Sequence, residues 1–232
     1  MRAKRNAPAQ YQPSRCYYPI DVVSDMPPRT TLRPALSESL QNDLAKITPS
    51  TDGRVEYFPC SVSLNDGQVL DRVYLVEQYQ YIRAWGIYPE PSRTLSVDDI
   101  VHAIDSPSRL PPKFADELYA AGESGMGYSI FLIVFADGSS RAYSTGGAVD
   151  FIEYPEGKNK ENVLRVSPHV GRDSKPFPAP NYYWALYSNE ETLRAFNLGL
   201  TDPIAIKSYS FAERVKMWLR RKLGVRNSSP QI

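Results

Sequence analysis

The chain has 232 residues, 42% hydrophobic and 23% charged, which fits one globular domain with a buried core. The longest apolar run, residues 130–136, is far shorter than the roughly 20 residues of a membrane-spanning helix, and no apolar stretch follows the basic start as in a secretory signal. The two cysteines form no C-x-x-C pair and there are only two histidines, so we expect no metal site. We also expect no cofactor, no transmembrane segment and a cytoplasmic location.

The net charge of +1 conceals an uneven distribution. Residues 1–15 carry +4 and residues 211–232 carry +5, whereas residues 16–210 contain 17 basic and 25 acidic side chains, a charge of −8. The basic ends either contact an anionic partner or fold back on the acidic body, and both readings stay open. For Cys16 and Cys60, two free thiols in a reducing compartment is a simpler reading than a disulfide.

The first half of the chain predicts an arm, a helix and a hairpin. Residues 1–34 contain six prolines and predict an extended basic arm, followed by a single domain over 35–232. Leucine spacing predicts a helix over about 35–47. Residues 55–64 and 69–84 predict two strands, joined by a tight turn at Asn65-Asp66-Gly67, with the long second strand bent or broken.

The next segments predict short helices and strands. Ser96 is placed to cap a helix reaching about 104, and a second helix is expected over 112–121, ended by Gly122. Residues 128–136 predict a central strand buried on both faces, followed by strands at about 140–144, 149–154, 163–166 and 182–187. The expected fold is α+β: a mainly antiparallel sheet of about six to eight strands with several short helices.

Two capping boxes, at residues 188–191 and 210–213, predict the last two helices. The final helix, 211–223, is basic and amphipathic, and its candidate binding residues are Arg214, Trp218, Arg220 and Arg221. Residues 211–226 could contact a partner protein, a nucleic acid or an anionic membrane. Alternatively, the apolar stripe packs on the domain and the basic face balances the acidic body.

The Gly122–Gly127 segment (GESGMG) and the sequence from Ser167 to Arg172 (SPHVGR) are the only candidates for catalysis. The first lacks the Lys-Ser/Thr of a phosphate-binding loop, so a helix cap and turn is the simpler reading, with an anion-binding nest as the alternative. In the second, His169 could act as a general base beside Arg172 as an anion clamp. Ser124, Tyr143, Asp150 and Glu153 could supply partners if the loops converge.

Aromatic residues gather in two regions that could form a binding groove: Tyr79, Tyr81, Trp85, Tyr183 and Trp184. The same residues are typical of cross-strand packing in a half-buried sheet, which is the reading we favour.

Three functions follow as hypotheses. The first is a protein–protein interaction module with an acidic, Tyr-rich body, such as a bacterial immunity or adaptor protein, which would not be an enzyme. The second is a hydrolase or transferase of an anionic substrate that uses His169, Arg172 and Ser124 near the Gly122–Gly127 turn. The third is nucleic-acid or membrane-surface binding through the C-terminal helix.

Overall fold

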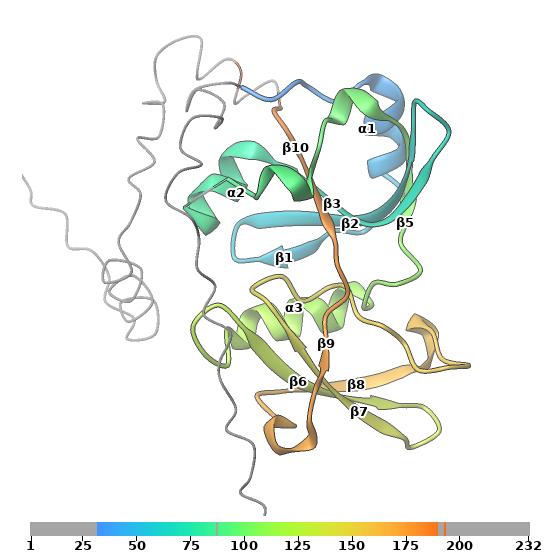
Figure 1. Ribbon diagram of the computed structural model, residues 1–232, viewed down its shortest axis with the longest axis vertical. Coiled ribbons are helices and arrows are strands. Elements are labelled where there is room, and N and C mark those ends of the chain that lie inside the picture. The colour runs from blue at the N-terminus through green and yellow to red at the C-terminus, as the bar shows by residue number, and fades with distance from the viewer. Residues whose placement is uncertain (1–31, 87, 190–192, 194–232) are drawn as a thin grey trace, which may run out of the picture. The chain divides into compact units, whose positions relative to one another are not determined.

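The computed structural model describes residues 32–86, 88–189 and 193, all within a unit that begins at Leu32. These residues form two mixed sheets, of six and four strands, with three α-helices (Figure 1). The α+β class is confirmed, and five of the strand pairings are antiparallel, but the prediction of a single sheet is wrong because there are two and both are mixed. Three strand pairings are parallel, because late strands return to earlier ones through long connections.

The six-stranded sheet has the order β1-β2-β3-β10-β4, and β5 also pairs with β2. Its strands are β1 (Ser50–Asp52), β2 (Val55–Leu64), β3 (Val69–Glu77), β4 (Thr94–Leu95), β5 (Ile100–Asp105) and β10 (Tyr183–Tyr187). The predicted hairpin of β2 and β3 is confirmed, and Gly67 takes a φ of 84° in its turn. β10 lies between β3 and β4 and is parallel to both.

The predicted strand over 69–84 is wrong in its second half. β3 ends at Glu77, and helix α2 (Gln78–Trp85) follows directly. The Glu77 carboxylate accepts a hydrogen bond from the Gln80 amide as the N-cap, and Gly86 ends the helix with a φ of 72°. The alternation of Gln and Tyr resembles a strand pattern, but the cap and the terminal glycine direct this segment into a helix.

The predicted helix over 96–104 is also wrong. Ser96 does cap a turn, since its hydroxyl accepts from the Asp98 amide, but the turn is a short 3-10 helix, η2 (Val97–Asp99). The chain then extends into β5, where pairing with β2 satisfies the backbone instead. His102 therefore lies on a strand, and its Nδ1 lies 3.1 Å from Oδ2 of Asp43.

Helix α1 (Glu38–Leu44) confirms the first predicted helix over a shorter range. Ser37 is its N-cap and accepts from the Leu40 amide. The helix packs against β5, and Leu40 and Leu44 are buried in the core on that side of the six-stranded sheet.

The four-stranded sheet has the order β8-β6-β7-β9. Its strands are β6 (Ser129–Phe135), β7 (Ser140–Thr145), β8 (Val163–Pro168) and β9 (Phe177–Pro178). Helix α3 (Pro112–Ala121) confirms its prediction and packs against both β1 and β8. The predicted strand at 149–154 is wrong, since only an isolated bridge between Arg109 and Phe151 forms there. Two 3-10 turns, η3 (Lys160–Asn162) and η4 (Arg172–Ser174), lie in this part of the chain, and a third, η1 (Pro91–Arg93), precedes β4.

The core is continuous between the two sheets. One cluster of buried side chains includes Tyr74 and Trp184 from the six-stranded sheet and Phe131 and Tyr143 from the four-stranded sheet. The second half of β3 is buried on both faces, because Tyr74 and Val76 face this cluster while Val73 and Leu75 face the core beneath α1. β6 is central as predicted, but Leu132 and Val134 on its second face are only half-buried.

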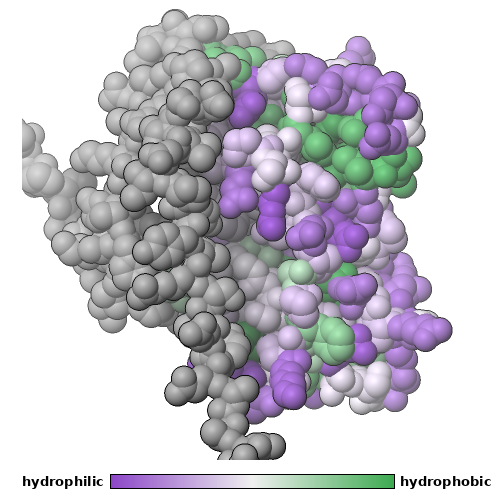
Figure 2. All heavy atoms as spheres, in the orientation of Figure 1, coloured by the Kyte–Doolittle hydropathy of each residue, from purple (hydrophilic) through white to green (hydrophobic). Residues whose placement is uncertain are grey.

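The face drawn in Figure 2 is mainly hydrophilic, with separate hydrophobic areas. On the β2–β3 hairpin, Val69 is 68% exposed. No helix within the described ranges is long and apolar enough to cross a membrane. Of the predicted helix that starts at residue 188, the structure describes only residues 188, 189 and 193, where the Leu193 amide donates to the Asn189 carbonyl at 3.0 Å. The predicted helix 211–223, including Arg214, Trp218, Arg220 and Arg221, and the predicted arm up to residue 31 lie outside the described residues.

Candidate functional site

The turn that follows α3 is held by its own backbone. The Gly122 amide donates to the Leu118 and Tyr119 carbonyls and ends the helix, with a φ of 76°. The amides of Ser124 and Gly125 donate to the Tyr128 carbonyl, and the Gly127 amide donates to Oε2 of Glu123. Four amides of this turn therefore already have acceptors. This supports the predicted cap and turn, and it leaves few donors for an anion-binding nest.

The side chain of Ser124 lies beside His169, the residue that follows β8, and β8 is an edge strand of the four-stranded sheet. Its Oγ is 2.9 Å from Nδ1 of His169, although 45 residues separate the two in sequence. The same Oγ accepts from the Ile130 amide at 2.8 Å and lies 3.2 Å from the Ile130 carbonyl oxygen. The structure thus brings together two of the three residues named as catalytic candidates.

The position of His169 follows from the register of β6 and β8. Phe131 pairs with Pro168 at the end of β8, and the His169 amide then donates to the Ile130 carbonyl at 2.8 Å. His169 has a φ of 63°, in the left-handed region that non-glycine residues seldom adopt. Such strain is common at functional sites, where the surrounding structure holds it in place.

Arg172 is the third candidate, and it reaches the same turn. Its Nη2 lies 3.3 Å from both the Ser124 carbonyl and the Tyr128 hydroxyl. The preceding Gly171 passes so close to β7 that a Cβ there would lie 2.6 Å from Ala142 Cβ. Only glycine fits this approach, which fixes where η4 begins and hence where Arg172 lies.

The hydrogen bonds around His169 indicate its tautomer. Nε2 lies 3.3 Å from the Ala121 carbonyl, which can only accept, so Nε2 carries the proton. Nδ1 is then an acceptor and faces the Ser124 hydroxyl, the arrangement in which an imidazole takes a proton from a nucleophile. A carbonyl here orients the ring as a carboxylate does in the serine hydrolases. No carboxylate within the described ranges contacts His169.

The other partners proposed for His169 lie elsewhere. The Tyr143 hydroxyl donates to the Glu153 carbonyl at 3.0 Å, and Tyr143 is buried in the core. Asp150 is fully buried and accepts from the Tyr119 hydroxyl. Of the four residues considered, only Ser124 joins His169.

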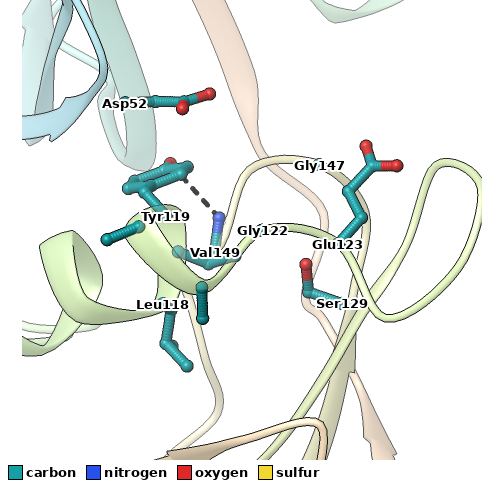
Figure 3. Close-up of a pocket in the computed structure, with 10 residues that line it drawn as sticks. Asp52, Leu118, Tyr119, Gly122, Glu123, Ser129, Gly147 and Val149 are labelled. Atoms are coloured by element: carbon teal, nitrogen blue, oxygen red, sulfur yellow. Dashed lines mark hydrogen bonds between the residues drawn. The ribbon is translucent and has the colours of Figure 1, made fainter. Parts of the chain in front are cut away.

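A cavity of about 320 Å³ opens beside the end of α3 (Figure 3). Asp52 from β1 and Glu123 from the turn both line it, with Tyr119 near Asp52 and Ser129 near Glu123. Helix and loop residues complete its wall: Leu118, Ala120, Ala121, Gly122, Gly147 and Val149. The cavity and the Ser124–His169 pair share the segment 121–124, but neither member of the pair lines the cavity.

The candidate aromatic residues lie mostly within the domain. Tyr81 and Trp184 are 2% and 5% exposed, and their ring centroids are 4.9 Å apart. Trp85 is half-buried, and its indole N–H donates to the Tyr57 hydroxyl at 2.9 Å. Tyr79 and Tyr183 are half-buried. Tyr81, Trp85 and Trp184 are therefore packed in the core or against it.

Sequence reasoning did not identify Tyr128, Glu123 or Asp52 as site residues. Tyr128 stands in a turn and Asp52 at the end of a three-residue strand, so no periodic pattern marks them. No group of three or more His, Cys, Asp or Glu side chains in the described part of the chain could hold a metal ion.

The sequence matches no known family model, and neither the curated proteins nor the solved structures include a match to this chain.

Proposed function

We propose that the protein is a hydrolase or transferase that acts on an anionic substrate, with Ser124 as nucleophile, His169 as base and Arg172 as the anion contact. The observation that carries the proposal is the 2.9 Å contact between Ser124 Oγ and His169 Nδ1 across 45 residues of sequence. A nucleophile and base within hydrogen-bond reach, with the base oriented by a third group, is the signature of an activated hydroxyl.

The proposed reaction needs only groups at this turn. His169 Nδ1 takes the Ser124 proton while Oγ forms a bond to an electrophilic carbonyl carbon or phosphorus. The bond to the leaving group then breaks, and the leaving group departs with the proton from His169. Water or a second acceptor releases the bound group in a reverse sequence. Arg172, whose Nη1 and Nε have no hydrogen bond among the described residues, would hold the negative charge.

A reactive probe tests this proposal. We expect a fluorophosphonate to form an adduct with Ser124 in the full chain, detected by peptide mass spectrometry. Ser124→Ala removes the adduct, and His169→Gln slows its formation by about a hundredfold or more, the usual contribution of a general base.

Two control variants match these substitutions. Ser92→Ala changes an exposed serine of η1, and His102→Gln changes the other histidine of the chain, so neither alters labelling. Labelling of Ser124 at an unchanged rate in His169→Gln would show that the histidine does not activate the serine, and the proposal would fail.

An interaction module remains the second candidate, supported by charge. Residues 32–189 contain 14 Lys and Arg and 20 Asp and Glu, a formal charge of −6. Such a surface favours a basic partner. The tyrosines add less to this candidate than their number suggests, since many of them form the core.

A further inference from the structure

We infer that the cavity beside α3 binds the side chain of a lysine or arginine from a basic partner protein. The inference is independent of the Ser124–His169 pair, because neither residue lines the cavity. It rests on the size of the cavity, the chemistry of its wall and the charge around it.

The size suits a single side chain. Ligand pockets usually measure about 300–1,000 Å³, so a cavity of about 320 Å³ lies at the small end of that range. The wall is partly apolar, with Leu118 and Val149 among its residues. A long aliphatic stem could lie along this part while its charged end reaches polar groups.

The charged side chains of the wall are both acidic. Asp52 and Glu123 line the cavity from different elements (Figure 3), and none of its described lining residues is Lys, Arg or His. Glu123 Oε2 accepts from the Gly127 amide, whereas Oε1 has no hydrogen bond among the described residues. The Gly127 contact holds the carboxylate in place, so Oε1 is available to an incoming donor.

The surroundings favour a protein over a small amine. α3 carries Asp116 and Glu117 directly before the lining residue Leu118, and Asp116 accepts from the Thr51 amide next to Asp52. These acids extend the negative surface past the cavity, within a stretch whose formal charge is −6. A single amine would use only the cavity, whereas a segment with several basic residues would use the wider surface as well.

Binding of a labelled peptide tests the inference. The probe is a fluorescein-labelled peptide in which lysine and arginine alternate with alanine, measured by fluorescence anisotropy at low ionic strength with the full chain. We expect Glu123→Gln, which keeps an oxygen to accept the Gly127 amide, to raise Kd by about tenfold or more, as for loss of a close charge pair.

Glu156→Gln is the matched control, because Glu156 is exposed, does not line the cavity and loses the same charge. Its Kd should change by less than about twofold, as expected for a distant, screened charge. Ala121→Leu fills the cavity without changing charge and should also weaken binding. Urea unfolding of each variant confirms that it folds.

Three outcomes would overturn the inference. Equal effects of Glu123→Gln and Glu156→Gln would indicate non-specific attraction to an acidic surface. No change with Ala121→Leu would place the peptide outside the cavity. The third outcome concerns the double variant Arg220→Gln/Arg221→Gln. If this variant binds the peptide with a lower Kd than the wild type, and the further substitution Glu123→Gln removes that gain, the C-terminal segment of the same chain is the occupant.

Discussion

Asp150 is a fully buried carboxyl group in a setting that favours its protonated form. Its Oδ2 accepts from the Tyr119 hydroxyl at 2.6 Å, while Oδ1 has no hydrogen-bond partner among the described residues. Burial raises the pKa of Asp150, and the Ser50 and Tyr119 hydroxyl groups and the charge of Arg109 oppose this only in part. A raised pKa in the folded state means that folding binds a proton between the unfolded value of 3.8 and the folded value.

We therefore predict that the contribution of Asp150 to the free energy of unfolding becomes less favourable as the pH rises. Its favourable contribution is complete below pH 3.8 and is lost as the pH rises through the folded pKa. Asp150→Asn removes this titration and keeps an acceptor for Tyr119. The free energy of unfolding of the variant, relative to wild type, should rise between about pH 4 and pH 8 in urea titrations.

Asp71 provides a control, because its pKa is shifted in the opposite direction to that of Asp150. Burial raises its pKa, but hydrogen bonds from Ser106, Ser108 and Ser61 outweigh that effect, so the pKa of Asp71 lies below 3.8. Its contribution is present above pH 3.8 and is lost as the pH falls through the folded pKa. Asp71→Asn should therefore be most destabilising near neutral pH. A relative stability of Asp150→Asn that does not change with pH would contradict the assignment of a raised pKa.

Among the elements, the turn after α3 depends on a close contact between two of its residues. A Cβ at Gly125 would lie only 2.3 Å from the Tyr128 ring. We predict that Gly125→Ala destabilises the protein by about 1–3 kcal/mol, as for overpacking, and slows the labelling of Ser124, because Tyr128 also contacts Arg172. Urea unfolding and the probe rate measure the two effects.

Gly146→Ala is the matched control for this turn. A Cβ at Gly146 meets nothing closer than the Tyr182 hydroxyl, at 3.8 Å, which is an ordinary contact. Adding Tyr128→Ala to Gly125→Ala should recover part of the stability, since it removes the ring. If the double variant is no more stable than Gly125→Ala, the ring contact is not the cause.

Elements with strong local signals were predicted well. The Asn65–Gly67 turn, α3 with its terminal Gly122 and the apolar run of β6 each rest on residues close in sequence. The wrong predictions lie where strand pairing between residues distant in sequence determines the secondary structure. β5 was predicted as helix because Ser96 caps a turn, yet pairing with β2 extends the chain. No local pattern shows that β10 joins β3 and β4 in parallel.

The candidate site was predicted in its residues but not in its geometry. The sequence singled out His169, Arg172 and the Gly122–Gly127 turn, and the structure brings them together. The contact depends on the register that pairs Phe131 with Pro168, which a one-residue shift would destroy. The cavity with Asp52 and Glu123 was not predicted, because it forms between segments about 70 residues apart.

At the scale of the whole molecule, the shared core couples the two sheets. The ring centroids of Phe151 and of Tyr74 on β3 are 4.5 Å apart. Phe151 belongs to the same buried cluster as Phe131 on β6. We predict that Phe151→Ala lowers the free energy of unfolding by about 3–5 kcal/mol, as for large core truncations. Amide exchange should then become faster in β3 and β6 together.

Phe177→Ala serves as the control, because Phe177 is 45% exposed on β9. Its stability loss should be about 1 kcal/mol or less, as is usual for surface positions. Exchange that accelerates in one sheet alone in Phe151→Ala would indicate that the two sheets unfold separately.

The place of β10 also bears on how the chain folds during synthesis. β10 is the last described strand to leave the ribosome, and it lies between β3 and β4 in the six-stranded sheet. One side of β3 therefore stays unpaired until residue 187 has emerged. An unpaired strand edge invites association with other chains. Nascent or truncated chains that end before Tyr183 should therefore depend on chaperones far more than the full chain does.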